Sequence, residues 1–160
     1  MTISPLIVLL LAACNSGLSQ DLMLNDLEYF EAPGVNVLVY NNLFTGGFND
    51  EKTAGIELIH HGVRTAQGGA VRLSNTPEQW DLVPEIPNRK VDHASKTIES
   101  TLRYEDYDFE SRVIVSAKGT GVEISVYLDK ALPRELEGNA GFNLEFLPSQ
   151  YWGKTYLMAG

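Results

Sequence analysis

The chain has 160 residues, with 12 Lys and Arg against 21 Asp and Glu and a formal net charge of −9. This length suits one globular domain, because a chain of this size can bury a real hydrophobic core. The acidic balance argues against nucleic acid as a partner, since clustered Lys and Arg bind a phosphate backbone and no basic stripe is present. A single Cys excludes an internal disulfide framework and a thiolate-rich metal cluster built within this chain.

An uncharged segment at the N-terminus ends at the only cysteine. The apolar run over residues 6–13 leads directly into Cys14. It is much shorter than the ~20 residues that span a bilayer, so it predicts the apolar part of a signal peptide and no transmembrane helix. The alternative is a free cysteine buried at the end of a core helix. Residues 11–14 (LAAC) resemble a bacterial lipobox, which implies a signal peptide over 1–13 and a lipid on Cys14, although no Lys or Arg precedes the apolar run.

The predicted signal sets the organisation of the rest of the chain. Residues 14–20 would form a short polar tether that begins with the lipidated cysteine, and one domain is predicted over residues 21–160. The protein is therefore predicted to be exported and held to a membrane of the cell envelope by its N-terminal lipid. The sequence leaves open whether it faces the periplasm or the cell surface.

The body of the chain has the periodicity of β-strands, because apolar residues recur mostly at every second position between residues 35 and 129. Strands are predicted near residues 35–43, 55–60, 69–74, 88–94 and 142–147, and across 97–129. Helical signals are short: a capping box at Thr76–Gln79 that Pro84 soon ends, and a turn at Pro133–Glu137. These patterns predict an all-β fold, a sandwich of two antiparallel sheets that follows the signal peptide.

Residues 97–129 predict a three-stranded antiparallel meander with two-residue loops at Glu105–Asp106 and Gly119–Thr120. The loops would bring apolar residues opposite each other in the pairs Tyr104–Tyr107, Leu102–Phe109, Ile98–Val113, Ala117–Val122, Val115–Ile124 and Val113–Val126. The opposite face would then carry the oppositely charged pairs Arg103–Asp108 and Glu99–Arg112. A slip by one residue would turn the apolar set toward solvent, so burial is predicted to specify the register.

Two adjacent histidines, His60 and His61, are the first candidates for metal binding or acid–base chemistry. Neighbouring residues in a strand point to opposite faces, so the pair cannot easily share a metal, and only the distant His93 could add a third imidazole. Hydrogen-bonded histidines at a strand end are the structural alternative. The acidic stretches at 49–51 and 106–108 resemble fragments of a calcium loop but lack its spacing, and turns explain both. No metal site and no cofactor are predicted.

Aromatic side chains are the third candidate site. Trp80, Tyr151, Trp152 and Tyr156 could form a platform for carbohydrate, because the C–H face of a pyranose ring packs on an aromatic ring. Trp80 falls in the predicted helical turn, and Trp152 falls in a predicted turn between Pro148 and Gly153. The alternative is that these rings cap the open end of the sandwich.

Two long stretches carry a family resemblance. ELIHHGVRTAQGGAVRLSNTPEQWD at residues 57–81 and GFNLEFLPSQYWGKTYLM at residues 141–158 resemble the N-terminal β-sandwich module of secreted bacterial glycoside hydrolases, most like family nine. The resemblance implies an immunoglobulin-like sandwich that precedes a large helical catalytic domain, in which an Asp activates water and a Glu is the acid. No catalytic residue can be carried over, because this chain has no region that matches that domain. The resemblance also implies that the chain is the N-terminal part of a longer protein.

These observations predict a non-catalytic module of a lipid-anchored, polysaccharide-degrading enzyme, whose partner is a catalytic domain absent from this chain. One alternative is a stand-alone carbohydrate-binding lipoprotein that uses Trp80, Tyr151 and Trp152. Another is a small sugar-epimerising enzyme with His60 or His61 as the acid, which would need one of these histidines beside a carboxylate in a concave sheet face.

Overall fold

Two antiparallel sheets account for most of the residues that the structure describes. The structure is a computed structural model that describes residues 20–41, 55–72 and 84–155. The six-stranded sheet consists of β1 (Met23–Leu24), β2 (Phe30–Ala32), β3 (Val35–Val39), β4 (Ile56–His60), β5 (Val63–Arg72) and β10 (Gly141–Phe146). The four-stranded sheet consists of β6 (Glu85–Asp92), β7 (Thr97–Tyr104), β8 (Phe109–Lys118) and β9 (Gly121–Leu128). The prediction of an all-β chain with two antiparallel sheets is confirmed. The predicted signal peptide and the helical turn at Thr76–Gln79 lie outside the described residues.

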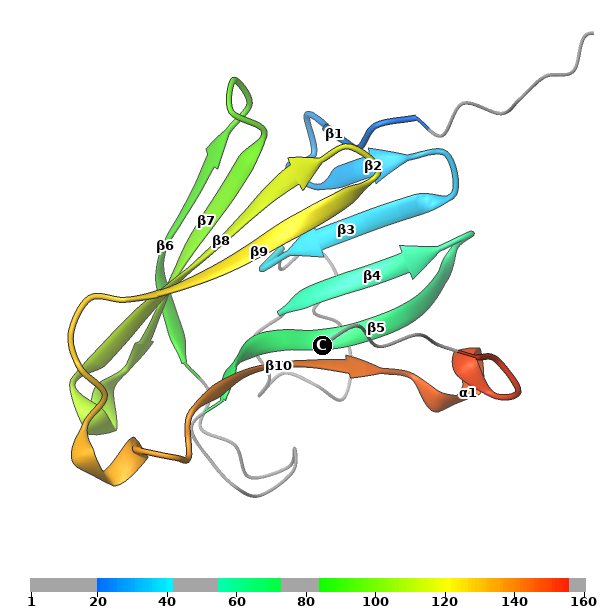
Figure 1. The fold of residues 1–160 in the computed structure, drawn as a ribbon. Helices are drawn as coiled ribbons and strands as arrows, with labels where there is room; N and C mark the ends of the chain where they lie inside the picture. The colour runs from blue at the N-terminus through cyan, green and yellow to red at the C-terminus, as the bar shows by residue number, and fades with distance from the viewer. Residues whose placement is uncertain (1–19, 42–54, 73–83, 156–160) are drawn as a thin grey trace, which may run out of the picture.

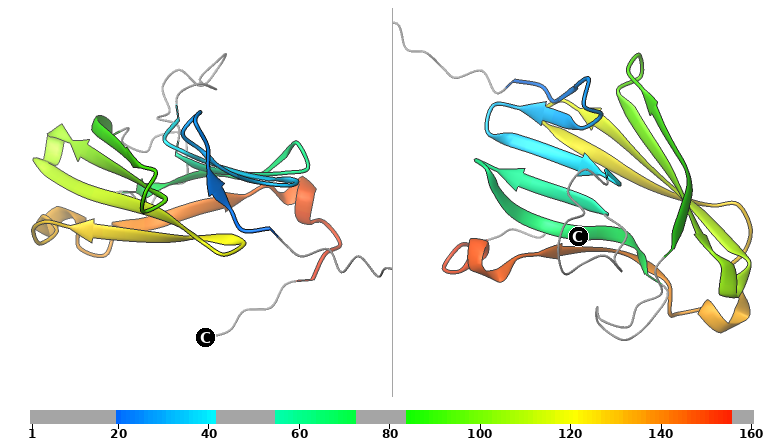
Figure 2. Two further views of the ribbon diagram at one scale, coloured as in Figure 1. Left: turned by 90° about the horizontal axis from the view of Figure 1, so that it is seen from above. Right: turned by 180° about the vertical axis from the view of Figure 1, so that it is seen from behind.

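The two sheets face each other as the layers of a sandwich (Figures 1 and 2). The orders are β1-β2-β3-β4-β5-β10 and β6-β7-β8-β9, so neighbours in space are neighbours in sequence except at β5 and β10. Between β9 and β10 the chain crosses from one sheet to the other through a 3-10 turn at Arg134–Leu136, within the predicted turn region. A one-turn helix, α1 (Pro148–Tyr151), follows β10. In the part of the chain that is described, no helix is long and apolar enough to cross a membrane.

The alternation of apolar residues located most strands, but it missed three features. β1 and β2 contain only two and three residues, too few to show a period. β5 begins at Val63, six residues before its prediction, because a two-residue loop pairs Val63 with His60. The loop residues His61 and Gly62 have φ angles of 49° and 77°, and a type I′ hairpin turn requires positive φ at both positions.

The β8–β9 hairpin has the predicted register, whereas the prediction for the β7–β8 hairpin is wrong by two residues. The observed pairs are Tyr104–Phe109, Leu102–Ser111 and Ile98–Val115. The reason lies in the loop: Glu105–Tyr107 form a 3-10 turn, and Asp108 closes it with a φ angle of 43°. The loop therefore takes four residues instead of two. A shift of two keeps the same side chains on the inner face, so the predicted faces survive.

The same shift changes one predicted charge pair and keeps the other as a diagonal contact. Arg103 lies opposite Glu110, with 3.7 Å between nitrogen and oxygen, instead of opposite Asp108. Arg112 still contacts Glu99 at 3.7 Å. Since these side chains are partly exposed, water screens the attraction and each pair adds little to stability.

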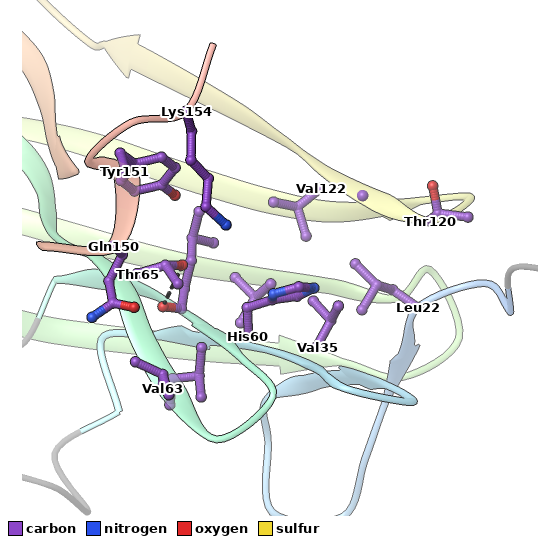
Figure 3. Close-up of a pocket in the computed structure, with 14 residues that line it drawn as sticks. Leu22, Val35, His60, Val63, Thr65, Thr120, Val122, Gln150, Tyr151 and Lys154 are labelled. Carbon is purple, nitrogen blue, oxygen red and sulfur yellow. Dashed lines mark hydrogen bonds between the residues drawn. The ribbon is translucent and has the colours of Figure 1, made fainter. Parts of the chain in front are cut away.

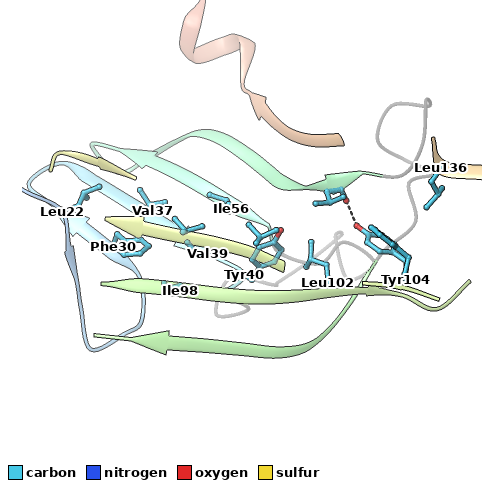
Figure 4. Close-up of a cluster of buried hydrophobic side chains, with 14 residues drawn as sticks. Leu22, Phe30, Val37, Val39, Tyr40, Ile56, Ile98, Leu102, Tyr104 and Leu136 are labelled. Carbon is cyan, nitrogen blue, oxygen red and sulfur yellow. Dashed lines mark hydrogen bonds between the residues drawn. The ribbon is translucent and has the colours of Figure 1, made fainter. Parts of the chain in front are cut away.

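The hydrophobic core lies between the sheets (Figure 4). Side chains that are at most 2% exposed come from both layers: Phe30, Val37, Val39 and Ile56 from the six-stranded sheet, and Ile98, Leu102, Phe109, Val113 and Val115 from the four-stranded sheet. Each fully buried Val, Leu, Ile or Phe contributes about 1.5–3 kcal/mol relative to an exposed one. The contact between these two inner faces therefore holds the sheets together.

Two buried tyrosines add hydrogen bonds to this core. The Tyr40 hydroxyl, directly after β3, donates to the carbonyl oxygen of Gly69 at 3.1 Å. The Tyr104 hydroxyl, at the end of β7, donates to the carbonyl oxygen of Val71 and so links the two sheets. Burial raises the pKa of Tyr40, because the phenolate would lose its water, and the nearby Tyr104 acts in the same direction.

Candidate functional site

A pocket of about 460 Å³ opens between the two sheets beside the β4–β5 hairpin (Figure 3). The strands β3, β4 and β5 form one wall, and Leu22 with the β8–β9 turn lies across from it. Residues in and after α1 border the remaining side. The lining residues are Leu22, Val35, Val37, Leu58, Ile59, His60, Val63, Thr65, Thr120, Gly121, Val122, Gln150, Tyr151 and Lys154.

Half of these 14 residues are aliphatic, and two of them, Leu22 and Val37, are only 1% and 2% exposed. They belong to the core, so the wall of the pocket continues into the hydrophobic interior. His60, Tyr151 and Lys154 are exposed and lie around the mouth. The pocket therefore has an apolar wall and a polar rim, as many small-molecule sites do.

The polar rim is positively charged. Lys154 carries a positive charge, and among the described residues that line the pocket none is Asp or Glu. In Figure 3 the Lys154 amine and the Tyr151 hydroxyl point toward the middle of the pocket, with the His60 ring on the other side. The Thr65 hydroxyl donates its proton to the carbonyl oxygen of Leu58 at 3.2 Å, so its donor is not available to a ligand. Within the described residues, neither the His60 ring nor the Lys154 amine has a hydrogen-bond or ion-pair partner.

Backbone hydrogen bonds hold the three parts of the pocket in place. The Leu22 amide donates to the carbonyl oxygen of Gly119 at 2.8 Å, which joins the segment before β1 to the β8–β9 turn. The Leu147 amide donates to the carbonyl oxygen of Thr65 at 3.0 Å and fixes the start of α1 beside β5. Beyond α1, the Lys154 amide donates to the carbonyl oxygen of Tyr151 at 3.0 Å, and Gly153 has a φ angle of 70°. This turn brings Lys154 back over the pocket.

The two adjacent histidines differ from their prediction. His60 is the last residue of β4, but His61 lies in the turn, so the rings do not point to opposite faces. Their centroids are 4.4 Å apart in an edge-to-face arrangement. The His61 amide donates to the carbonyl oxygen of Gly34 at 2.7 Å, and a Cβ at Gly34 would lie 2.6 Å from the His61 ring. His61 therefore has a packing role, whereas His60 lines the pocket.

The predicted aromatic residues are only partly described. Tyr151 ends α1 and is 41% exposed, and Trp152 follows it and is 89% exposed. The Tyr151 ring meets the Phe146 ring edge to face, with centroids 5.4 Å apart. Trp80 and Tyr156 lie outside the described residues. The structure thus brings Phe146 and Tyr151 into contact, and the exposed Trp152 follows Tyr151 in the chain; we call these three residues the aromatic corner.

Other predicted candidates show no site chemistry. Asp108 closes the β7–β8 turn and accepts a hydrogen bond from Lys130 at 3.1 Å. No group of three or more metal-ligating side chains is found among the residues described. An epimerase would need a carboxylate beside His60, and the lining residues that the structure describes include none. The acidic stretch at 49–51 and the predicted lipid site Cys14 lie outside the described residues.

Sequence reasoning missed the pocket and the contribution of Lys154. The described lining residues come from five separate segments of the chain, at residues 22, 35–37, 58–65, 120–122 and 150–154, and no local pattern reports that these segments meet. No protein family model, no curated protein and no solved structure matches the chain, so no relative suggests a function for these residues.

Proposed function

We propose that the chain is an exported carbohydrate-binding lipoprotein that holds a glycan on the aromatic corner. The observation that carries the proposal is the exposure of Trp152, which is 89% accessible and follows Tyr151, itself 41% accessible and in contact with the Phe146 ring, which is 56% accessible. An exposed cluster of large apolar side chains is typical of a binding surface. Aromatic rings suit a pyranose, since its C–H face is apolar and its hydroxyls stay in water.

The test is affinity electrophoresis of the purified full chain in gels that contain β-glucan, xylan or other polysaccharides. We expect at least one glycan to retard the chain, and Trp152→Ala to weaken binding about tenfold, a typical loss for one anchor residue. Trp152 makes little contact with the fold, so the variant will remain folded. Tyr127→Ala is the matched control, because Tyr127 is 47% exposed on β9, away from the aromatic corner. Unchanged migration in every gel, or equal loss in both variants, would contradict the proposal.

The proposed attachment to the membrane rests on Cys14 and the apolar run before it. Labelling of growing cells with palmitate tests it directly. We expect label in the wild-type chain and none in Cys14→Ser, and an unlabelled wild-type chain would refute the anchor.

A second candidate is a supporting module of a polysaccharide-degrading enzyme. It is favoured by the end of the edge strand β9, where Val126 and Leu128 form a strip on one face and are 37% and 46% exposed. A neighbouring domain that covered this strip would bury its apolar surface. The strand order does not add support for an immunoglobulin-like module: β6 to β9 follow one another in one sheet, whereas a constant-type immunoglobulin fold places at most two consecutive strands in the same sheet. A reading frame that continues past codon 160 into a helical domain would support the candidate, and a stop codon there would contradict it.

A further inference from the structure

We propose that the pocket between the sheets binds an amphipathic carboxylate, such as a fatty acid of about eight to ten carbons. The volume of the pocket, about 460 Å³, lies in the range of small-molecule sites. The aliphatic chain would lie along the inner wall, and the carboxylate would lie at the mouth near Lys154 and His60. This site is separate from the proposed glycan surface, and the two share only Tyr151.

The charge of the pocket supports an anionic ligand. The chain as a whole is acidic, with a net charge of −9, yet none of the described residues that line the pocket is Asp or Glu, while Lys154 and His60 do line it. Both side chains lack partners among the described residues, so their donors are available to a ligand. A carboxylate can accept hydrogen bonds from both an ammonium and an imidazole N–H, and such charge-assisted bonds are strong.

The wall of the pocket supports an aliphatic body. Leu22, Val37, Leu58 and Val122 offer no hydrogen-bonding side-chain atoms, and the Thr65 hydroxyl uses its only donor on the backbone, so it could offer a sugar only an acceptor. A sugar placed here would lose water from its hydroxyls without gaining partners on this wall, which costs free energy. A hydrocarbon chain would instead gain from leaving water.

The experiment titrates the full chain with octanoate, decanoate and octanol, each below the concentration at which it forms micelles, by calorimetry and by NMR shifts of the Val and Leu methyl groups. We expect decanoate to bind about tenfold more tightly than octanoate, because two more methylenes leave water. We expect octanol to bind about tenfold more weakly than octanoate, because it lacks the charge. The largest methyl shifts should fall on the pocket wall.

Variants separate this site from nonspecific binding. Lys154→Gln should weaken octanoate about tenfold while changing octanol by less than about twofold, since only the carboxylate uses the amine. Lys90→Gln removes the same charge from an exposed position on β6 and should leave both affinities unchanged. Trp152→Ala should also leave them unchanged, so a failure of the glycan proposal would not mimic a failure here. The proposal is overturned if decanoate does not saturate, if octanol matches octanoate, if glucuronate binds in place of decanoate, or if Lys90→Gln acts like Lys154→Gln.

Discussion

The hydrogen bond between Tyr40 and Gly69 gives a prediction that depends on pH. Tyr40 is 2% exposed, and its hydroxyl donates at 3.1 Å to a carbonyl oxygen that lies where the pairing of β5 and β10 is irregular. Tyr40→Phe removes the donor and leaves that carbonyl oxygen without it. At pH 7 we expect the variant to lose about 1–2 kcal/mol of unfolding free energy, the range for a buried hydrogen bond whose acceptor stays unsatisfied.

The difference should shrink in alkaline solution. Because burial raises the pKa of Tyr40, the folded chain keeps the proton above pH 10, whereas the unfolded chain releases it. The stabilisation from this group is therefore complete below pH 10 and is lost as the pH rises further. In the unfolded wild type, Tyr40 has its ordinary pKa of 10, so its ionisation at pH 11 lowers the unfolding free energy by about 1.4 kcal/mol. The Phe variant has no hydroxyl at this position and does not lose this amount. The two free energies should nearly coincide at pH 11.

The assay is urea unfolding at pH 7, 10 and 11, followed by far-UV circular dichroism. Tyr127→Phe, at an exposed hydroxyl on β9, is the control and should stay within ~0.5 kcal/mol of wild type at each pH. The reasoning is refuted if the curves of wild type and Tyr40→Phe against pH run parallel, because the hydroxyl would then titrate alike in both states.

Two further substitutions test the packing. Ser100→Ala should stabilise the chain by about 1 kcal/mol, because the Ser100 hydroxyl is buried without a hydrogen-bond partner; a loss of 1 kcal/mol in thermal unfolding would show that it has one. Gly69→Ala should destabilise by about 1–3 kcal/mol, since the added Cβ would lie 2.7 Å from the Cβ of Ile56. Gly121→Ala, where a Cβ would meet nothing within 4 Å, should be close to neutral in the same urea titration, and equal effects at both glycines would contradict the packing argument.

Local patterns were sufficient wherever a strand alternates and its turn is short. Gly119 and Thr120 predicted the register of the β8–β9 hairpin, because a two-residue loop leaves one pairing that buries Val113 and Val115. The β7–β8 loop was harder, because a 3-10 turn closed by Asp108 allows a four-residue connection that keeps the same inner face. Both registers bury the same residues, so the hydrophobic pattern could not choose between them.

For the candidate sites too, local sequence patterns predicted some features and not others. The turn between Pro148 and Gly153 that contains Trp152 is a local signal, and the structure shows Trp152 exposed there. No local pattern predicted the contact between the His60 and His61 rings, because this contact depends on the positive φ of His61 in a type I′ turn. Only the tertiary contacts place Lys154 over the β4–β5 hairpin.

The sequence by itself determined that the chain is built from strands and which side of most strands faces inward, since that information lies in a period of two residues. The tertiary structure alone decided which inner faces meet, where the sheets leave a pocket and which distant side chains border it. These outcomes depend on the packing of two whole sheets and on backbone hydrogen bonds between remote segments, such as Leu22 to Gly119 and Leu147 to Thr65. No short window of sequence contains those contacts, so no periodicity can report them.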